Sequence, residues 1–308
     1  MLFISGAGNA FKNVNLPTLI VMVGNAGDVG VAHISDMRFS VTEPLPGAII
    51  VQVNIAGAPG DVGIWNTQVT MGGTAETTIR NTCTNQDTSS CMAAFLALHL
   101  TSSSSACLQN IWIWAADHNL DGGSGYTVIS TGHGILVEST KATWLVGTGS
   151  EHNWLYNYNF NSAQIVFAGL VQTESPYNQG SGATLLAPAP WVAKSQYGDP
   201  DFSWCGGGDG ECRTALGQNV NGGSELFLYN TAAWAFFNGS WTGNYGTQCS
   251  GNCQTNMNRI SANPSQLFWY GIGTRNADVM VLDGQSNPKM LNNPGGWGAN
   301  MVAYRQFS

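Results

Sequence analysis

Charged side chains are scarce in this sequence of 308 residues, and basic ones are the scarcest. Only 9% of the residues are charged, against roughly 25% in a typical globular protein. Ten Lys and Arg stand against 18 Asp and Glu, which gives a formal net charge of −8. Because proteins that bind nucleic acid neutralise phosphates with Lys and Arg, this composition argues against a nucleic-acid partner.

Long hydrophobic runs are also missing. No apolar stretch approaches the roughly 20 residues that a transmembrane helix needs, so the sequence predicts no membrane partner. The first residues, MLFISGAGNAF, have neither the basic start nor the apolar length of a signal peptide and are typical of the interior of a strand. We therefore expect that targeting residues have been removed or that the chain is a piece of something longer.

The sequence lacks the motifs of several common catalytic and cofactor sites. It contains no GxSxG elbow for a serine nucleophile. The glycines at 206–208 follow no clear strand and precede no helix, so we expect no phosphate cradle there. His99, His133 and His152 are scattered, and no CxxC pair is present. The sequence predicts no metal site and no cofactor.

Short apolar runs between turn residues are what the sequence has instead. Hydrophobic residues make up 43% of the chain, and 39 glycines interrupt them. Runs of this length, rich in β-branched and aromatic residues, predict strands. The predicted strands are 19–23, 33–39, 48–54, 63–71, 93–98, 106–114, 134–139, 143–148, 154–160, 164–172, 225–229, 232–237, 267–270 and 278–282. The best candidate for a helix is 92–98, which overlaps one of these runs.

Two all-β architectures fit this pattern. Strand starts at roughly ten- to fifteen-residue intervals fit a parallel β-helix with two or three strands per coil. A β-sandwich is the alternative, and periodicity alone leaves the two near parity. The stretches 179–223 and 239–256 are too long for simple turns, and each holds a cysteine pair. We predict that both are loop insertions on one face, each cross-linked by a disulfide.

Six of the seven cysteines form three close pairs in loop-like sequence: Cys83 with Cys91, Cys205 with Cys212, and Cys249 with Cys253. Local disulfides are the favoured interpretation, and they indicate an oxidising compartment. Cys107 is left over beside an apolar run, which predicts a buried free thiol. One glycosylation sequon, which begins at Asn238, fits a secreted glycoprotein.

Two carboxylates, Glu151 and Glu174, stand in an apolar, aromatic and amide-rich stretch, and 174 minus 151 is 23 residues, a plausible length for one coil. Residues one coil apart stack at about 4.7–4.9 Å. The two carboxylates would then share one groove and could not both ionise freely, so one could serve as an acid. An acid and a partner beside a water are what glycosidic bond cleavage needs. The alternative is that both glutamates lie on solvated loops and only maintain solubility.

Aromatic and polar side chains near these glutamates suit a polysaccharide. Rings stack on the CH faces of sugars, and polar groups bind the hydroxyls. Trp112 and Trp114 share one strand face; core packing is favoured for Trp112, whereas Trp114 adjoins a polar turn. The candidates for substrate binding are Trp114, Asp117, His118 and Tyr177.

Several motifs together resemble glycoside hydrolase family 55, whose members are secreted, mostly fungal exo-β-1,3-glucanases or laminarinases. The motifs are ISDMRFSV, VGIWNTQVTMGG, CMAAFLALHLTSSSSACLQNIWIWAADHNLD, GHGILVES, WLVGTGSEH and QTESPY. They follow the family's order and span nearly the whole chain from Ile34 onward. The chain resembles the C-terminal half of such an enzyme. The resemblance implies that 1–308 is a single right-handed parallel β-helix of the pectin-lyase type, the second of two arranged like a rib cage around the active cleft.

The resemblance also implies roles for particular residues. Glu174 in QTESPY matches the general acid, and Glu151 in GSEH matches a carboxylate beside the attacking water. Trp114, Asp117 and Tyr177 match positions near the terminal glucose. The family releases glucose from the non-reducing end with inversion, which requires carboxyl groups roughly 6.5–9.5 Å apart. One-coil stacking brings the backbones nearer than this, so the side chains must splay or Glu151 acts through a relay.

The family's first β-helix has no counterpart in this chain. It supplies polar residues that hold the nucleophilic water, so we expect little activity from this chain without an N-terminal half. The expected partners are that half and β-1,3-glucan. The alternatives are a catalytically silent glucan-binding module that uses Trp114 and Tyr177, and a purely structural or adhesive β-helix.

Overall fold

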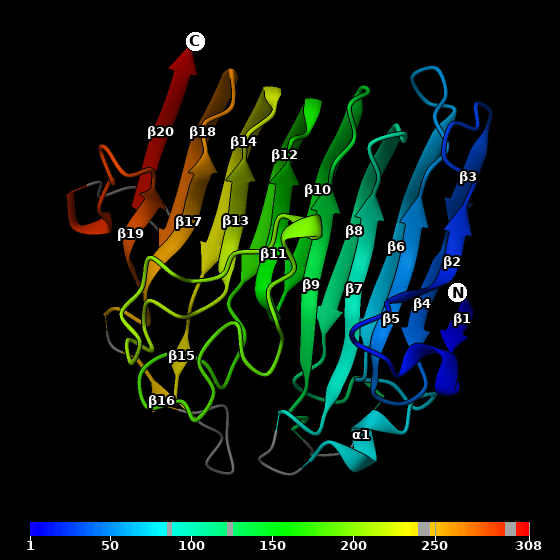
Figure 1. The fold of residues 1–308 in the computed structure, drawn as a ribbon, viewed down its shortest axis with the longest axis horizontal. Helices are drawn as coiled ribbons and strands as arrows, with labels where there is room; N and C mark the ends of the chain where they lie inside the picture. Colours follow the sequence, from blue (N-terminus) through cyan, green and yellow to red (C-terminus); the bar gives the residue numbers. More distant parts are fainter. Residues whose placement is uncertain (85–87, 122–125, 240–246, 250, 293–299, 308) are drawn as a thin grey trace.

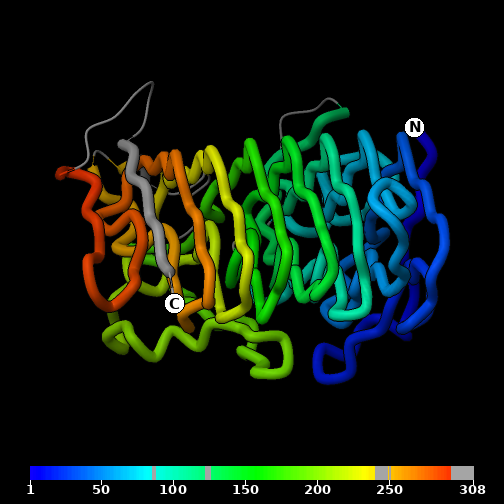
Figure 2. The backbone as a smooth tube through the Cα atoms, turned by 90° about the horizontal axis from the view of Figure 1, so that it is seen from above, coloured from blue at the N-terminus to red at the C-terminus, as the bar shows by residue number. Residues whose placement is uncertain are grey.

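In the computed structural model, the chain forms two long sheets of mostly parallel strands that run side by side along one axis (Figure 1). The structure describes residues 1–84, 88–121, 126–239, 247–249, 251–292 and 300–307. The chain alternates between the two sheets, so that β8, β9, β10, β11 and β12 enter them in turn. The coils stack from the N-terminus at one end to the C-terminus at the other (Figure 2).

The elements have the following bounds. The larger sheet contains β1 (Leu2–Gly6), β3 (Ala32–Ser35), β4 (Met37–Val41), β6 (Val62–Met71), β8 (Ala106–Ala115), β10 (Thr143–Glu151), β12 (Gln164–Glu174), β14 (Ser224–Trp234), β18 (Gln266–Arg275) and β20 (Asn300–Phe307). The smaller sheet contains β2 (Thr18–Val23), β5 (Leu45–Val53), β7 (Met92–Leu100), β9 (Ser130–Val137), β11 (Asn153–Asn161), β13 (Leu216–Asn221), β17 (Gln254–Ala262) and β19 (Ala277–Leu282). The remaining elements are β15 (Phe237–Asn238), β16 (Thr247–Gln248), α1 (Ile79–Thr82), η1 (Asn9–Phe11), η2 (Ser195–Tyr197) and η3 (Met290–Asn292).

This architecture is a parallel β-helix, as predicted, and the alternative of a β-sandwich is wrong. Neighbouring strands within each sheet come from successive coils and pair in parallel, for example β8 with β10 and β10 with β12. A sandwich of hairpins would pair consecutive strands antiparallel. Antiparallel pairing among the described strands is confined to β18 with β20 and β15 with β16. The 23-residue spacing of the two glutamates therefore does equal one coil.

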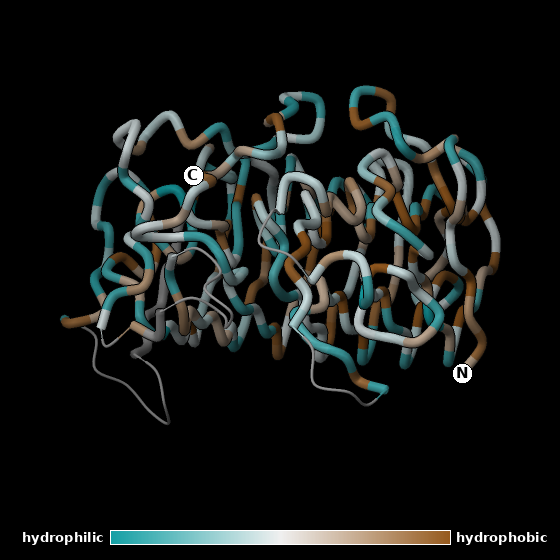
Figure 3. Tube along the Cα trace, turned by 90° about the horizontal axis from the view of Figure 1, so that it is seen from below, coloured by the Kyte–Doolittle hydropathy of each residue, from teal (hydrophilic) through white to brown (hydrophobic). Residues whose placement is uncertain are grey.

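The hydrophobic core fills the inside of the coils. Side chains of both sheets alternate between this core and the outside, and residues of opposite hydropathy follow one another along the coils (Figure 3). Inward residues such as Leu145, Val166 and Leu226 are almost fully buried. Because the inward positions are apolar, the chemistry-bearing side chains of β10 and β12 must occupy the outward ones.

A column of left-handed residues bends the long strands of the larger sheet. Asn66, Asn110, Gly147, Leu170 and Asn230 occupy equivalent positions in successive coils, and all have φ between 47° and 60°. Asparagine and glycine tolerate this conformation best. The Nδ2 of Asn110 donates to Asn66 Oδ1 at 2.9 Å, which links neighbouring coils. The bend separates the half of each strand that approaches the glutamates from its other half.

Some sequence predictions of elements were wrong. The stretch 92–98 forms strand β7 and no helix, although its Ala and Leu favour helix formation. Residues 93–100 are all buried, because β7 has the core on one side and other apolar side chains on the other. Such two-sided burial favours a parallel strand over local propensity. The predicted strands 225–229 and 232–237 are largely one strand, β14.

The two predicted loop insertions contain strands that their polar sequences concealed. β13 lies inside 179–223, and β17 begins inside 239–256; 240–246 and 250 lie outside the described residues. The rest of the first insertion before β13, 179–215, packs on the outer face of the smaller sheet, where Trp191 contacts Phe95 with ring centroids 6.2 Å apart. Beneath it, Nε2 of His133 lies 2.9 Å from Asp199 Oδ2, and both side chains are buried.

All three predicted disulfides are present, joining Cys83 to Cys91, Cys205 to Cys212, and Cys249 to Cys253. Cys107 is free, as predicted, but it is only half-buried because it points outward from β8. Burial nevertheless raises the pKa of its thiol.

Across the described segments, every helix is too short to cross a membrane.

Candidate active site

Glu151 and Glu174 end two neighbouring strands of the larger sheet. They close β10 and β12, and their Cα atoms are direct partners in the parallel ladder. Ser150 and Thr173, the residues before them, point inward and are fully buried. By the alternation of a strand, both glutamates therefore point outward from one edge of the coil. The prediction that they stack one coil apart is confirmed.

Each glutamate is held by an aromatic donor. Nε1 of Trp112 donates to Glu151 Oε2 at 3.3 Å, and the hydroxyl of Tyr177 donates to Glu174 Oε1 at 2.7 Å. One oxygen of each carboxylate and one ring nitrogen of His152 all lie within 4.8 Å of one another. The two acids and the imidazole thus form a single cluster.

His152 occupies the corner of the coil directly after Glu151. Its backbone is left-handed, with φ of 62°, and its N–H donates to the backbone oxygen of Glu174 at 3.0 Å. Its Nδ1 lies 3.1 Å from the carbonyl oxygen of Ala115 and 3.6 Å from Asp117 Oδ1. Its Nε2 lies 3.5 Å from Glu174 Oε1, an ion-pair distance rather than a well-formed hydrogen bond. The buried ring therefore lies between two carboxylates.

The cluster shifts the pKa values of two of its members. Burial raises the pKa of Glu151, and the charge of Glu174 adds to this, while His152 and the Trp112 donor act in the opposite direction. Burial alone would lower the pKa of His152, but Glu174, Asp117 and Glu151 outweigh it and raise that pKa to about 9. His152 is therefore a cation at neutral pH, in a site where Glu151 holds its proton more tightly than an exposed glutamate does.

A buried amide network supports both glutamates from inside the coil. Nδ2 of Asn157 donates to the backbone oxygen of Glu174 at 2.9 Å. Nδ2 of Asn153 donates to the backbone oxygen of Glu151 at 3.2 Å and to Asn157 Oδ1 at 2.9 Å. Both asparagines are fully buried. Two coils are thus tied together directly behind the acids.

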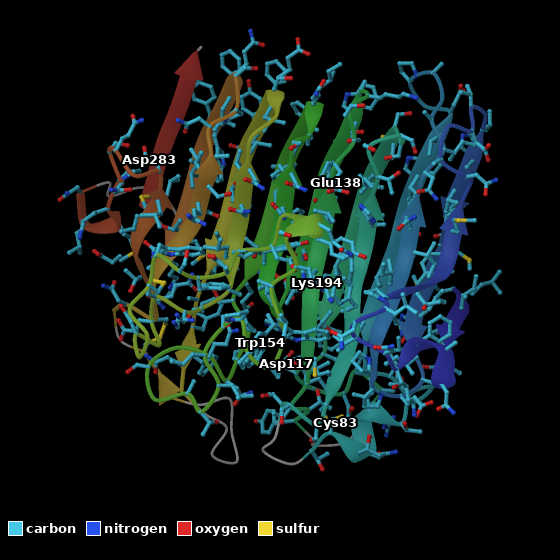
Figure 4. The ribbon with its side chains drawn as sticks, viewed as in Figure 1. Cys83, Asp117, Glu138, Trp154, Lys194 and Asp283 are labelled. Carbon is cyan, nitrogen blue, oxygen red and sulfur yellow. A yellow bond between two sulfur atoms is a disulfide. The ribbon has the colours of Figure 1, made fainter. Side chains whose placement is uncertain are left out.

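The predicted substrate-binding residues gather around the same cluster. Asp117 lies in the lower half of the view in Figure 4, and it lines a small hollow together with His152 and Tyr177. Nδ1 of His118 lies 3.1 Å from Asp117 Oδ1, and its ring meets that of Trp114 edge-on. Trp114 points outward from β8 but is only 1% exposed.

Core packing for Trp112, which the sequence favoured, is wrong. Its side chain points outward and is only half-buried, its ring stacks on Trp114 with centroids 4.8 Å apart, and it donates to Glu151. Sequence reasoning also missed His152, which it treated as scattered. The places of Trp112 and His152 in the site could be predicted only once the coil register was known. Trp114 pairs with Glu151, so Trp112 lies one outward position away from that pair.

The cluster also has the composition of a metal site, although the sequence predicted none. Glu151, His152 and Glu174 each offer one ligand atom within the 4.8 Å limit. An imidazole must be neutral to bind a metal ion. A metal ion at this cluster would therefore have to displace the proton that the carboxylates favour on His152.

No protein-family model matches the chain. Several proteins, among them the following three, are similar to it over most of its length. It is 40% identical over 304 residues to Glucan endo-1,3-beta-glucosidase BGN13.1 of Trichoderma harzianum, which covers 96% of this chain and 39% of that protein. It is 32% identical over 282 residues to Glucan 1,3-beta-glucosidase of Cochliobolus carbonum, covering 87% of this chain and 34% of that protein. It is 33% identical over 304 residues to Non-secreted LysM effector LysM15 of Penicillium expansum, covering 96% of this chain and 20% of that protein.

The chain thus spans between a fifth and two fifths of the length of these relatives. Two of the three names specify 1,3-beta-glucosidases, which agrees with the resemblance to glycoside hydrolase family 55. Over most of its own length, the chain is thus similar to one part of the proteins named glucan 1,3-β-glucosidases, whose full length it does not span.

Proposed function

We propose that this chain is the acid-bearing part of an enzyme that hydrolyses β-1,3-glucan. In this proposal, Glu174 donates the proton to the leaving oxygen, and Asp117, His118 and Tyr177 surround the terminal glucose, with the buried ring of Trp114 packed behind them. The single observation that carries it is the pairing of Glu151 with Glu174 across adjacent coils, where Trp112 and Tyr177 donate to the two carboxylates. The relatives named for action on 1,3-β-glucan support the substrate class.

We propose release of glucose from the non-reducing end with inversion. One oxygen of each carboxylate lies within 4.8 Å of the other, which is shorter than the roughly 6.5–9.5 Å of an inverting pair. For inversion at this separation, Glu151 has to position the attacking water through a relay and does not remove its proton directly. The anomer released first from a reduced laminarioligosaccharide, followed by NMR, tests this. α-Glucose agrees with inversion, whereas β-glucose would make Glu151 a nucleophile.

The test of the acid is Glu174→Gln, compared on laminarin and on 2,4-dinitrophenyl β-glucoside. Laminarin hydrolysis should fall by about 10²–10⁴-fold, the usual contribution of a general acid. Hydrolysis of the activated glucoside, whose leaving group needs no proton, should fall far less. Glu225→Gln, at the exposed start of β14, is the control and should hydrolyse both substrates normally. Equal turnover of laminarin by Glu174→Gln and the unchanged chain would refute the acid assignment.

We also propose that the active protein is secreted and that its missing N-terminal half completes the cleft. Three local disulfides support an oxidising compartment. The proposed glycan site at Asn238 depends in part on Ser240, which lies outside the described residues.

A glucan-binding module without catalysis is the second candidate, and the similarity to a relative named as a LysM effector favours it. It predicts that laminarin binds but that no glucose is released, even when the N-terminal half is supplied. Glucose release that depends on Glu174 would reject this candidate.

A further inference from the structure

The outward row that contains the two glutamates continues past them for two more coils. Glu174 pairs with Trp234 at the end of β14, and Trp234 pairs with Arg275 at the end of β18. Their inward neighbours Ala233 and Thr274 are fully buried, so Trp234 and Arg275 point outward beside Glu174. Trp114 and Glu151 complete the row on the other side.

The next outward row has small side chains at the same coils. Ala232 precedes Trp234 by two residues, and its ladder partner in β18 is Gly273. Residues two apart in a strand share one face, so the outward neighbours of Trp234 and Arg275 along their strands are small residues. The side chains of Trp234 and Arg275 are therefore the large outward groups at these two coils beside Glu174.

Aromatic rings surround this end of the row. The ring of Phe236 meets that of Trp234 edge-on at 5.9 Å, and the guanidinium of Arg275 lies 5.8 Å from the Phe236 centroid. The ring of Phe237 meets that of Tyr177, the residue that donates to Glu174, at 5.0 Å. Trp234 and Phe236 are half-buried, and Arg275 is exposed. An indole face and guanidinium donors beside small outward residues suit a neutral polyhydroxylated chain.

We infer that Trp234 and Arg275 bind the glucose units on the leaving-group side of the scissile bond. This inference rests on the proposed function, which sets the terminal glucose against Asp117, in front of the buried Trp114 and on the opposite side of Glu174 from Trp234. A chain that runs along the helix axis then passes Trp234 first and Arg275 second, at successive coils about 4.8 Å apart. Trp234 stacks on the first leaving unit, and Arg275 donates to hydroxyls of the next.

Binding of laminarioligosaccharides of two to six glucose units, measured by calorimetry on the Glu174→Gln chain, tests this inference without hydrolysis. Affinity should rise with each unit up to the length that reaches Arg275. Trp234→Ala should weaken binding of the longer oligosaccharides about 3- to 10-fold and flatten the rise. Arg275→Ala should weaken the binding only of oligosaccharides that are one glucose unit longer than those first affected by Trp234→Ala. Trp144→Ala and Arg38→Ala, at the far end of β10 and in β4, are the matched controls and should leave the length dependence unchanged.

The outcomes separate the inference from the proposed function. Length-dependent binding that requires Trp234, in a protein that never releases glucose, would support the inference and refute hydrolysis. Hydrolysis with a length dependence unaffected by either variant would overturn the inference alone. Failure to bind any laminarioligosaccharide would also overturn it. Far-UV circular dichroism of each variant verifies that the fold is intact.

Discussion

At the scale of single residues, the site is defined by contacts between positions far apart in the chain. His152 contacts Glu174 across one coil and lies near Asp117 from the previous one. Its neighbours keep the imidazole protonated although it is buried, because two carboxylates compensate its loss of hydration. The cation in turn reduces the repulsion between the two glutamates.

This protonation predicts a specific dependence of stability on pH. The pKa of His152 is raised to about 9 in the folded chain from 6.5. Between these values the folded state retains a proton that the unfolded state has lost, so the free energy of unfolding falls as the pH rises. The loss should be at most about 2 to 3 kcal/mol. Urea unfolding at pH 6.5 and pH 9 measures it.

The control for this prediction is a neutral replacement that tolerates the left-handed backbone. His152→Asn should abolish most of the fall in stability between pH 6.5 and pH 9. The variant His33→Asn, on β3 and away from the site, should show the same fall in stability as the unchanged chain. A fall of the same size in the His152→Asn chain would show that another group titrates.

At the scale of elements, the strand ends are fixed by the buried amide network behind them. β10, β11 and β12 belong to consecutive coil segments, and Asn153 and Asn157 of β11 bind backbone oxygens at the ends of the other two. The Glu174 carbonyl already accepts the His152 N–H, and the second, buried amide donor from Asn157 fixes this corner further.

Asn157→Leu should therefore destabilise the chain by about 2 to 3 kcal/mol, because it removes the buried Asn157 donor to the Glu174 carbonyl and the Asn157 oxygen that accepts from Asn153. The urea midpoint should fall with an unchanged slope. Asn15→Leu, at an exposed loop position, is the control and should change the midpoint little. A midpoint for Asn157→Leu equal to that of the control would contradict the supporting role.

At the scale of the whole molecule, this β-helix presents its acids on an outer edge, and the chain spans only part of its relatives' length. An open edge leaves the attacking water poorly oriented, and water orientation supplies much of a hydrolase's rate. The chain alone should therefore hydrolyse laminarin at least about 10²-fold more slowly than a longer protein that includes the N-terminal half. Glucose release by both proteins at equal concentration measures this, and equal rates would show that the single β-helix is sufficient.

The sequence by itself determined many of the strands and the disulfides, and it indicated the coil length, because these depend on local composition and on spacing along the chain. Alternating apolar residues predicted β6, β8 and β10, and close cysteine spacing predicted the three pairs. Only the tertiary structure decided that 92–98 is a strand, that polar stretches hold β13 and β17, and that Trp112 and His152 join the acids. These outcomes depend on which coil lies against which, and burial between stacked coils overrides local propensity.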